Sequence, residues 1–194
     1  MNLDLDPAQR DLVTALRESP GGRPASETVE AAGARPAGAF EWCLAFEELG
    51  ALVAGFDLPR EDLLRGAAYA VGVGRKCLEL AQRRAGDRTV AGRPLIEHQG
   101  VAHRLANAAV ELACARVGLW RTAWSRDRGK PPADQVYVAT AVCVTAAVGC
   151  AHELVQIFGA AGTSEPVVTR LYRAAYGLPD VCGSPGELWR RVGR

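Results

Sequence analysis

The connector between two long helical segments contains residues that a simple turn does not need. It reads DRTVAGRPLIEHQ from Asp87 to Gln99, with Arg88 near its start and Gln99 eleven positions after that arginine. A guanidinium group can bind phosphate oxygens through two parallel hydrogen bonds, so one alternative is that Arg88 binds an anion. The other is structural. Arg88 would then cap the C-terminus of the first helix, and Gln99 would be a solvated residue in the first turn of the second.

The six cysteines show no spacing typical of metal or redox chemistry. None forms a CxxC pair, and none pairs with a histidine at metal-ligand spacing. Five of them lie inside or beside apolar helical runs, where a reduced cysteine packs as a small hydrophobic residue. The pattern predicts no metal site and favours a reducing compartment, most simply the cytoplasm. The positions are Cys43, Cys77, Cys114, Cys143, Cys150 and Cys182.

Composition excludes several classes of partner. The 194 residues are 48% hydrophobic and 23% charged, with a formal net charge of +1, so no general field attracts the protein to nucleic acid or to an acidic membrane. The start, MNLDLDPAQRD, is acidic and polar, unlike a signal peptide. Because we find no run of about 18 uncharged apolar residues, we expect no membrane span.

The hydrophobic periodicity predicts an all-α protein whose helices pack antiparallel as a bundle. Residues 19–39 are rich in Pro, Gly and Ala and are expected to form a poorly ordered linker. The segment from 134 to 158 is apolar almost all round, so it should be the central and most buried helix. We find no convincing strand pattern and no repeat. The expected helices cover approximately 7–18, 40–54, 60–84, 97–128, 134–158 and 167–176.

Four short motifs carry a resemblance to a known family. They are DRTVAGRPL followed by HQ (87–95 and 98–99), AWSRDRGKP (123–131), VQIFGAAG (155–162) and LYRAA (171–175). Their order and spacing, over about 135 residues, resemble the C-terminal helical domain of acyl-CoA dehydrogenases, flavoproteins that oxidise the α–β bond of acyl thioesters. LDPAQRDLVTALR and FEELGALVA are similar to parts of the family's N-terminal helical domain. The resemblance implies two regions: remnant N-terminal helices over 1–55, with the flexible linker 19–39, and a bundle over 56–194.

The resemblance also implies a cofactor and a set of ligands. In the family, the arginine and glutamine of the first motif reach across a subunit interface to the pyrophosphate and adenosine end of FAD. The Gln-x-x-Gly-Gly segment approaches the same cofactor, because its glycines let backbone N–H groups come close. Carried over to this sequence, the implied FAD-binding residues are Arg88, Gln99, Gln156 and Gly159.

The sequence departs from the family pattern at the cofactor surface. Between FEELGALVA and GFDLPRED there is no room for the family's middle β-barrel domain, which covers the flavin ring. The aromatic residue of the arginine loop is Ala91 here, and the second glycine of the glycine pair is Ala160. Because half of the flavin cradle belongs to the missing domain, we expect the isolated chain to bind FAD weakly or not at all.

The catalytic base is also altered. The position of the family's usual glutamate holds Cys182, whose thiol could be a nucleophile, a packing residue or neutral to function. Other members place the base early in the first long helix, where Glu61 and Asp62 fall in this sequence. Both acids are equally suited to stabilise a helix N-terminus.

Three functions fit these features. The first is a short subunit of an FAD-dependent oxidoreductase that acts on an acyl-CoA or acyl-carrier-protein substrate with a partner chain, either itself or a homologous subunit. The second is a repurposed enzyme for dehydration, isomerisation or cyclisation of a CoA- or carrier-bound acyl chain. The third is a non-catalytic subunit that stabilises a full-length homologue. Arg88 and Gln99 favour the first function, whereas the loss of the glutamate and of the barrel favours the others.

Overall fold

The computed structural model describes residues 5–18, 29, 36, 38–52, 62–129 and 133–193. Most of the predicted linker 19–39 and all of Glu61 lie outside these residues, so the predictions made for them stay predictions. The helices are α1 (Pro7–Glu18), α3 (Ala39–Leu52), α4 (Leu63–Asp87), α5 (Gln99–Asp127), α6 (Ala133–Phe158), α7 (Ala161–Ser164), α8 (Pro166–Cys182) and α9 (Pro185–Arg191), and the 3-10 turn η1 covers Leu95–Glu97. Two short strands, β1 (Thr89–Val90) and β2 (Arg93–Pro94), complete the described elements.

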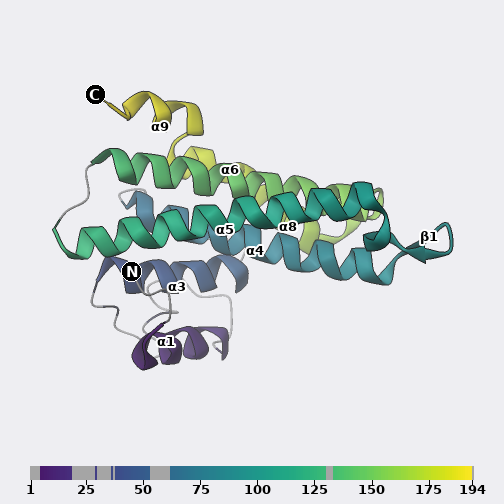
Figure 1. Ribbon diagram of the computed structural model, residues 1–194, viewed down its shortest axis with the longest axis horizontal. Helices are drawn as coiled ribbons and strands as arrows, with labels where there is room; N and C mark the ends of the chain where they lie inside the picture. Colours follow the sequence, from purple (N-terminus) through teal and green to yellow (C-terminus); the bar gives the residue numbers. More distant parts are fainter. Residues whose placement is uncertain are drawn as a thin grey trace.

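Three long helices, α4, α5 and α6, lie side by side and form the body of the molecule (Figure 1). α8 packs against α6 and α4, α3 packs against α4, and α1 lies on α3 (Figure 1). The predicted all-α bundle is therefore confirmed. α8 is longer than predicted, because it continues through Pro179 to Cys182, where Leu178 and Cys182 are buried in the last turns.

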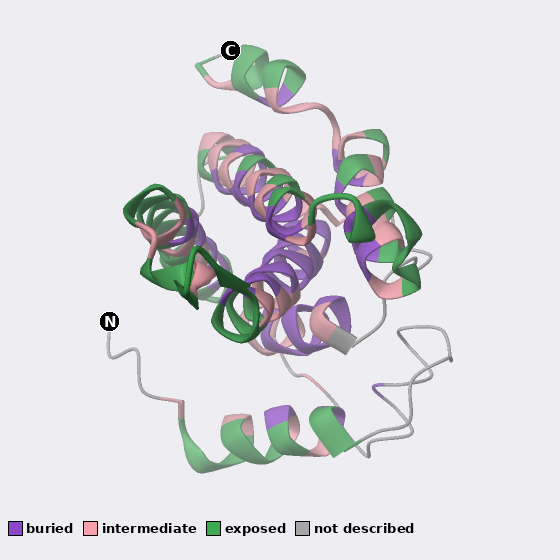
Figure 2. Ribbon diagram, turned by 90° about the vertical axis from the view of Figure 1, so that its right-hand side faces the viewer, coloured by how far each residue is buried: buried purple, intermediate pink, exposed green. Residues whose placement is uncertain are grey.

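α4 contains the longest buried stretch among the described helices, in place of the predicted segment 134–158. Every residue from Gly66 to Gly74 is buried, whereas α6 alternates buried and partly exposed positions. The reason is residue size: glycines and alanines let α3, α6 and α8 approach α4 closely on several sides. Figure 2 shows the buried positions facing the interior of the bundle.

The connector that follows α4 is an antiparallel hairpin, although no strand was predicted. Thr89 pairs with Pro94 and Val90 with Arg93. The two turn residues, Ala91 and Gly92, have φ of +51° and +80°, and positive φ at both positions is what a type I′ turn requires. In Figure 1 this hairpin projects from one end of the bundle.

α3 is joined to the bundle by backbone contact and by buried charges. A Cβ on Gly50 would overlap the carbonyl oxygen of Tyr69 in α4, so only glycine allows this approach. Glu47 is 1% exposed and lies 2.8 Å from Arg116 Nη2 in α5. Glu48 is 3% exposed and lies 2.7 Å from Arg75 Nη2 in α4. These pairs connect α3 to both α4 and α5.

α6 meets the length and composition criteria of a membrane span. Its most apolar 18-residue window has a mean hydropathy of 1.7, yet 56% of that window is buried inside the protein. α6 packs against α4, α5 and α8. Burial against neighbouring helices accounts for its apolar composition as that of a core helix.

Candidate functional site

Two of the predicted cofactor ligands, Arg88 and Gly159, lie together. Arg88 is the C-cap residue of α4, and its backbone N–H donates to the carbonyl of Arg84 at 3.0 Å. Its side chain is exposed and extends to the end of α6, where Nη1 lies 3.7 Å from the point that a Cβ on Gly159 would occupy. Gly159 has a φ of +62°, which favours glycine. A Cβ there would be in ordinary van der Waals contact with the guanidinium group, so the positive φ is the main reason for glycine at this position.

The two predicted glutamines are exposed at the ends of long helices. Gln99 is the first residue of α5, and Gln156 lies in the last turn of α6, three residues before Gly159. Gln156 therefore belongs to the helix end that Arg88 approaches, and Gln99 follows the hairpin and turn η1 that Arg88 precedes. Ala160, which replaces the family's second glycine, has an ordinary helical φ of −55° and so accepts a side chain without strain.

A histidine that the sequence analysis did not select holds the hairpin against α5. His98 Nε2 lies 3.0 Å from the carbonyl oxygen of Val90, and Nδ1 lies 3.4 Å from Arg93 Nη2. The backbone N–H of Leu95 donates to the carbonyl of Arg88 at 2.7 Å. Together these bonds fix the path of the chain between Arg88 and Gln99.

Asp62, one of the predicted bases, is engaged as a helix cap. Its Oδ1 accepts from the backbone N–H of Leu64 at 3.2 Å and from Arg126 Nη1 at 3.0 Å. Its Oδ2 lies 3.2 Å from Arg65 Nε. Two guanidinium groups and a backbone N–H keep this carboxylate in a structural arrangement.

Cys182 is buried in the last turn of α8. It is 3% exposed, and a Cβ on Gly66 of α4 would lie only 2.6 Å from its Sγ, so the thiol fills the space that Gly66 leaves. Burial raises the pKa of Cys182 to about 11, so the thiol is un-ionised at neutral pH. These features support the packing role among the three roles left open by the sequence.

The predicted site residues form two groups at opposite ends of α4. Gly66, against which Cys182 packs, and Asp62 are at its N-terminus, whereas Arg88 follows its C-terminus. Twenty-two residues separate Gly66 from Arg88, which at 1.5 Å per residue corresponds to roughly 33 Å. At that separation the two groups make no contact with each other.

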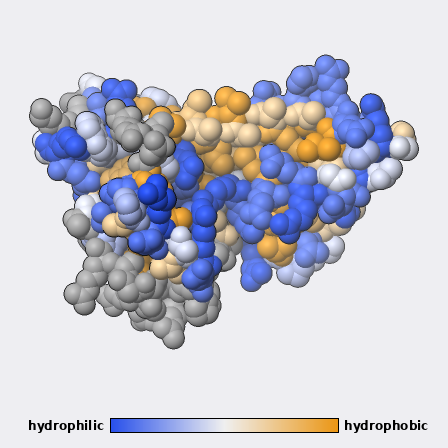
Figure 3. All heavy atoms as spheres, turned by 60° about the horizontal axis from the view of Figure 1, so that its bottom comes forward, coloured by the Kyte–Doolittle hydropathy of each residue, from blue (hydrophilic) through white to orange (hydrophobic). Residues whose placement is uncertain are grey.

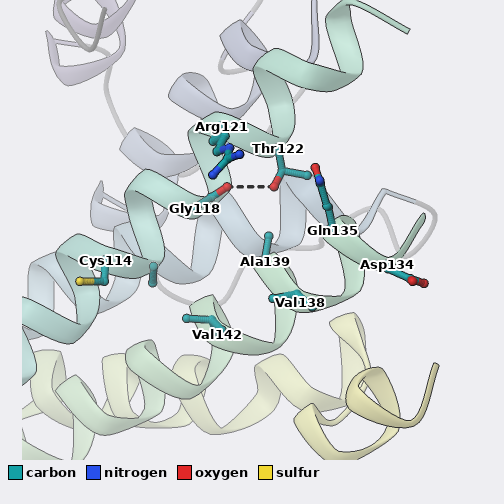
Figure 4. A pocket seen from close by; sticks show the side chains of 10 residues that line it. Cys114, Gly118, Arg121, Thr122, Asp134, Gln135, Val138, Ala139 and Val142 are labelled. Atoms are coloured by element: carbon teal, nitrogen blue, oxygen red, sulfur yellow. Dashed lines mark hydrogen bonds between the residues drawn. The ribbon is translucent and has the colours of Figure 1, made fainter. Parts of the chain in front are cut away.

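A separate groove of about 400 Å³ lies between α5 and α6 (Figure 4). Its lining includes Gly118 of α5 and Val138, Ala139 and Val142 of α6. Arg121 and Asp134 are its charged residues. The groove contains none of the predicted site residues. Within the described ranges, no cluster of three or more His, Cys, Asp or Glu residues could hold a metal ion.

The motifs and the fold together define a family. Residues 62–184 match the family model described as "Acyl-CoA dehydrogenase, C-terminal domain". The match covers more than half of the chain and includes the helices that carry the Arg88–Gly159 contact. The chain belongs to the acyl-CoA dehydrogenase family and contains its C-terminal helical domain, as the resemblance predicted.

Known proteins support this assignment and show its extent. The chain is 32% identical over 160 residues to the mitochondrial short-chain specific acyl-CoA dehydrogenase of Mus musculus. The matched region covers 79% of this chain but only 39% of that enzyme. The human enzyme of the same name is 32% identical over 143 residues, covering 71% of this chain and 34% of the relative. This chain therefore spans less than half the length of the relatives that it matches.

Solved structures show the same fold. A glutaryl-coenzyme A dehydrogenase in complex with glutaryl-CoA is 28% identical, with a TM-score of 0.64, covering 76% of this chain and 35% of that one. The ChsE4–ChsE5 complex from Mycobacterium tuberculosis is 27% identical, with a TM-score of 0.63, covering 78% of this chain and 39% of that one.

Proposed function

We propose that this chain is a short subunit of an FAD-dependent oxidoreductase that acts on an acyl thioester together with a homologous partner. In this assembly it supplies Arg88, Gln156 and Gly159 to the diphosphate of FAD held by the partner, with Gln99 at the adenosine end. The flavin, when bound, supplies the electron acceptor. The residues of this chain bind and orient its diphosphate.

The observation that carries the proposal is the position of the Arg88–Gly159 contact. It lies at the end of the bundle, roughly 33 Å along α4 from Gly66, against which Cys182 packs, and farther still from Asp62. A diphosphate bound at Arg88 therefore belongs to a catalytic centre that this chain's own candidate bases do not line. An exposed guanidinium beside a glycine of positive φ is chemically suited to that ligand.

A second observation supports a subunit partner. α5 exposes Val110 and Val117, with 61% and 45% of their surface accessible, and two helical turns place them on the same side of the helix. Trp124, 37% exposed, follows seven residues later. Apolar side chains gather in the middle of one face of the molecule, between hydrophilic ends (Figure 3). Such a face is typical of subunit contacts, and the similar ChsE4–ChsE5 structure is a complex of two proteins.

The test is flavin content in the presence of a partner. The chain is purified alone and with a full-length homologue encoded beside it, and the absorbance of bound flavin is measured in each sample. We expect flavin only in the mixed complex, and we expect Arg88→Met to lower its affinity by roughly tenfold or more, as the loss of a charge-assisted contact does. Arg83→Met is the matched control, because Arg83 is an exposed arginine of the same helix paired with Glu79.

One observation favours a second candidate, a non-catalytic subunit that stabilises a homologue. Cys182 is un-ionised and Asp62 is engaged as a cap, so the described residues present no free carboxylate at the predicted base positions. A mixed complex whose flavin content and dehydrogenase activity do not change with Arg88→Met would support this candidate and contradict the first. Conversion of an acyl thioester without flavin would instead support the repurposed, non-redox enzyme.

A further inference from the structure

The arginines of α4 divide into two kinds. Arg65, Arg75 and Arg83 lie 3.2, 2.7 and 3.3 Å from the carboxylates of Asp62, Glu48 and Glu79. Arg84 and the C-cap residue Arg88 have no carboxylate partner among the described residues. The two unpaired guanidinium groups therefore occupy the last turn and the cap of the same helix.

Both of these side chains extend toward the same place. Arg84 and Arg88 are four residues apart, so they lie on one face of the helix. The Arg84 guanidinium carbon lies 5.5 Å from the centre of the Phe158 ring, and Arg88 Nη1 lies 3.7 Å from the Cβ position of Gly159, the next residue. Two cations that converge on the end of α6 repel each other unless an anion lies between them.

The hydrogen bonding of Arg84 is also incomplete. Its Nε is buried and donates to no acceptor within the described structure. A buried donor without an acceptor is costly, and in native proteins such groups are few. Phe158 provides a cation–π contact for the guanidinium plane but accepts no directed N–H bond.

We propose that Arg84 is a second guanidinium ligand of the diphosphate that Arg88 binds, so that the site is a pair of arginines on one helical face. The inference rests on the proposed function and extends it, since neither the motifs nor the family resemblance selected Arg84. Two forks fit the two phosphoryl groups of a diphosphate, with the Gly159 backbone alongside. FAD and coenzyme A both contain an adenosine diphosphate, so the shared chemistry is the diphosphate itself.

The test uses the full chain titrated with inorganic pyrophosphate at low salt, followed by the NMR signals of the Gly159 amide and of the arginine Nε–H groups. We expect Arg84→Met and Arg88→Met each to weaken binding by roughly tenfold, because each removes one charge-assisted contact. Arg84→Lys keeps the charge but not the fork and should weaken binding less. Arg83→Met, which removes the same charge from the neighbouring position, should bind as the parent does.

The outcomes separate this inference from the proposed function. If Arg84→Met binds pyrophosphate as the parent does while Arg88→Met does not, Arg84 is no ligand. The role proposed for Arg88 at the diphosphate of FAD then stands. If Arg84→Met only lowers the stability of the fold, Arg84 serves the C-terminus of α6 and the inference is wrong. No change at Gly159 at millimolar pyrophosphate would overturn the paired site. Parallel titrations with FAD and coenzyme A show which source of diphosphate depends on Arg84.

Discussion

Arg88 and Gly159 meet where α4 and α6 end, with Nη1 of the arginine 3.7 Å from the position of an absent Cβ. The contact joins two residues, from separate motifs, that lie 71 positions apart in the sequence. A Cβ at that distance would be in ordinary van der Waals contact, so the requirement for glycine comes mainly from its backbone conformation.

Gly159→Ala should therefore destabilise the fold. The φ of +62° costs an L-residue about 1–2 kcal/mol, and we expect the free energy of unfolding in urea to fall by about that amount. Gly86→Ala is the control, because Gly86 lies within α4 with nothing within 4 Å of its Cβ position. It should stabilise the protein by about 0.5–1 kcal/mol. Equal effects of the two substitutions would show that the conformation of Gly159 imposes no requirement.

Ala91→Asn should stabilise the hairpin. Ala91 has a φ of +51°, and asparagine followed by glycine is the preferred pair in a type I′ turn. We expect about 0.5–1 kcal/mol of local stabilisation, measured as slower hydrogen exchange of the Leu95 amide, which bonds to the carbonyl of Arg88. Ala160→Asn, at an ordinary helical φ of −55°, should not slow this exchange. Faster exchange in Ala91→Asn would contradict the assigned turn.

Glu48→Gln should make stability less dependent on acid pH. Burial raises the pKa of Glu48, but hydrogen bonds from Arg75 and Arg17 outweigh it and hold the pKa below its ordinary 4.5. A depressed carboxyl pKa stabilises the fold above the unfolded value, and this contribution is lost as pH falls through the folded value. We expect Glu48→Gln to cost about 2 kcal/mol at pH 7 and to lose less stability than the parent below about pH 4.5.

The control for this pH series is Glu79→Gln, which removes an exposed acid paired with Lys76 and Arg83. An exposed pair contributes only about 0–1 kcal/mol. The free energy of unfolding of Glu79→Gln should therefore depend on acid pH as that of the parent does. A Glu48→Gln variant with the full acid dependence of the parent would show that the Arg75–Glu48 pair does not set it.

Gly66→Ala and Cys182→Ala should be coupled. A Cβ on Gly66 would lie 2.6 Å from Cys182 Sγ, and such overpacking costs about 1–3 kcal/mol. Removing the sulfur relieves the overlap. The free energy of unfolding of the double variant should therefore exceed, by about 1 kcal/mol or more, the value expected from adding the two single-variant changes. Urea unfolding of all four proteins measures this coupling. Strictly additive effects would remove the packing explanation for Cys182.

The long helices could be predicted because their apolar residues repeat every three or four positions. α5 and α6 begin and end within two residues of the predicted limits, and α1 ends at Glu18 as predicted. The hairpin could not be predicted, since Ala91 is an unusual residue at positive φ and neither strand exceeds two residues. α8 continues past the predicted end near Tyr176. Proline normally stops a helix, but burial of Leu178 and Cys182 holds the turns around Pro179.

The sequence could identify candidate residues of the site, but not how those residues are arranged in space. The resemblance selected Arg88 and Gly159 as ligands of one cofactor, but their direct approach to each other depends on how α4 packs against α6, and no local pattern encodes that packing. Arg84 was missed because one more arginine in a helix looks like a solvated residue. Its difference from Arg83 becomes visible only when the carboxylate of Glu79 is found beside one and not the other.

Asp127 gives the bundle a further property. It is the last residue of α5, and its two carboxylate oxygens accept from the backbone N–H groups of Ala39 at 2.6 Å and Phe40 at 3.0 Å, the first residues of α3. The cap of one helix is therefore supplied by the terminus of another, 88 residues away. Fraying of α5 at its C-terminus removes the acceptor that starts α3, so the two ends open and close as one cooperative unit.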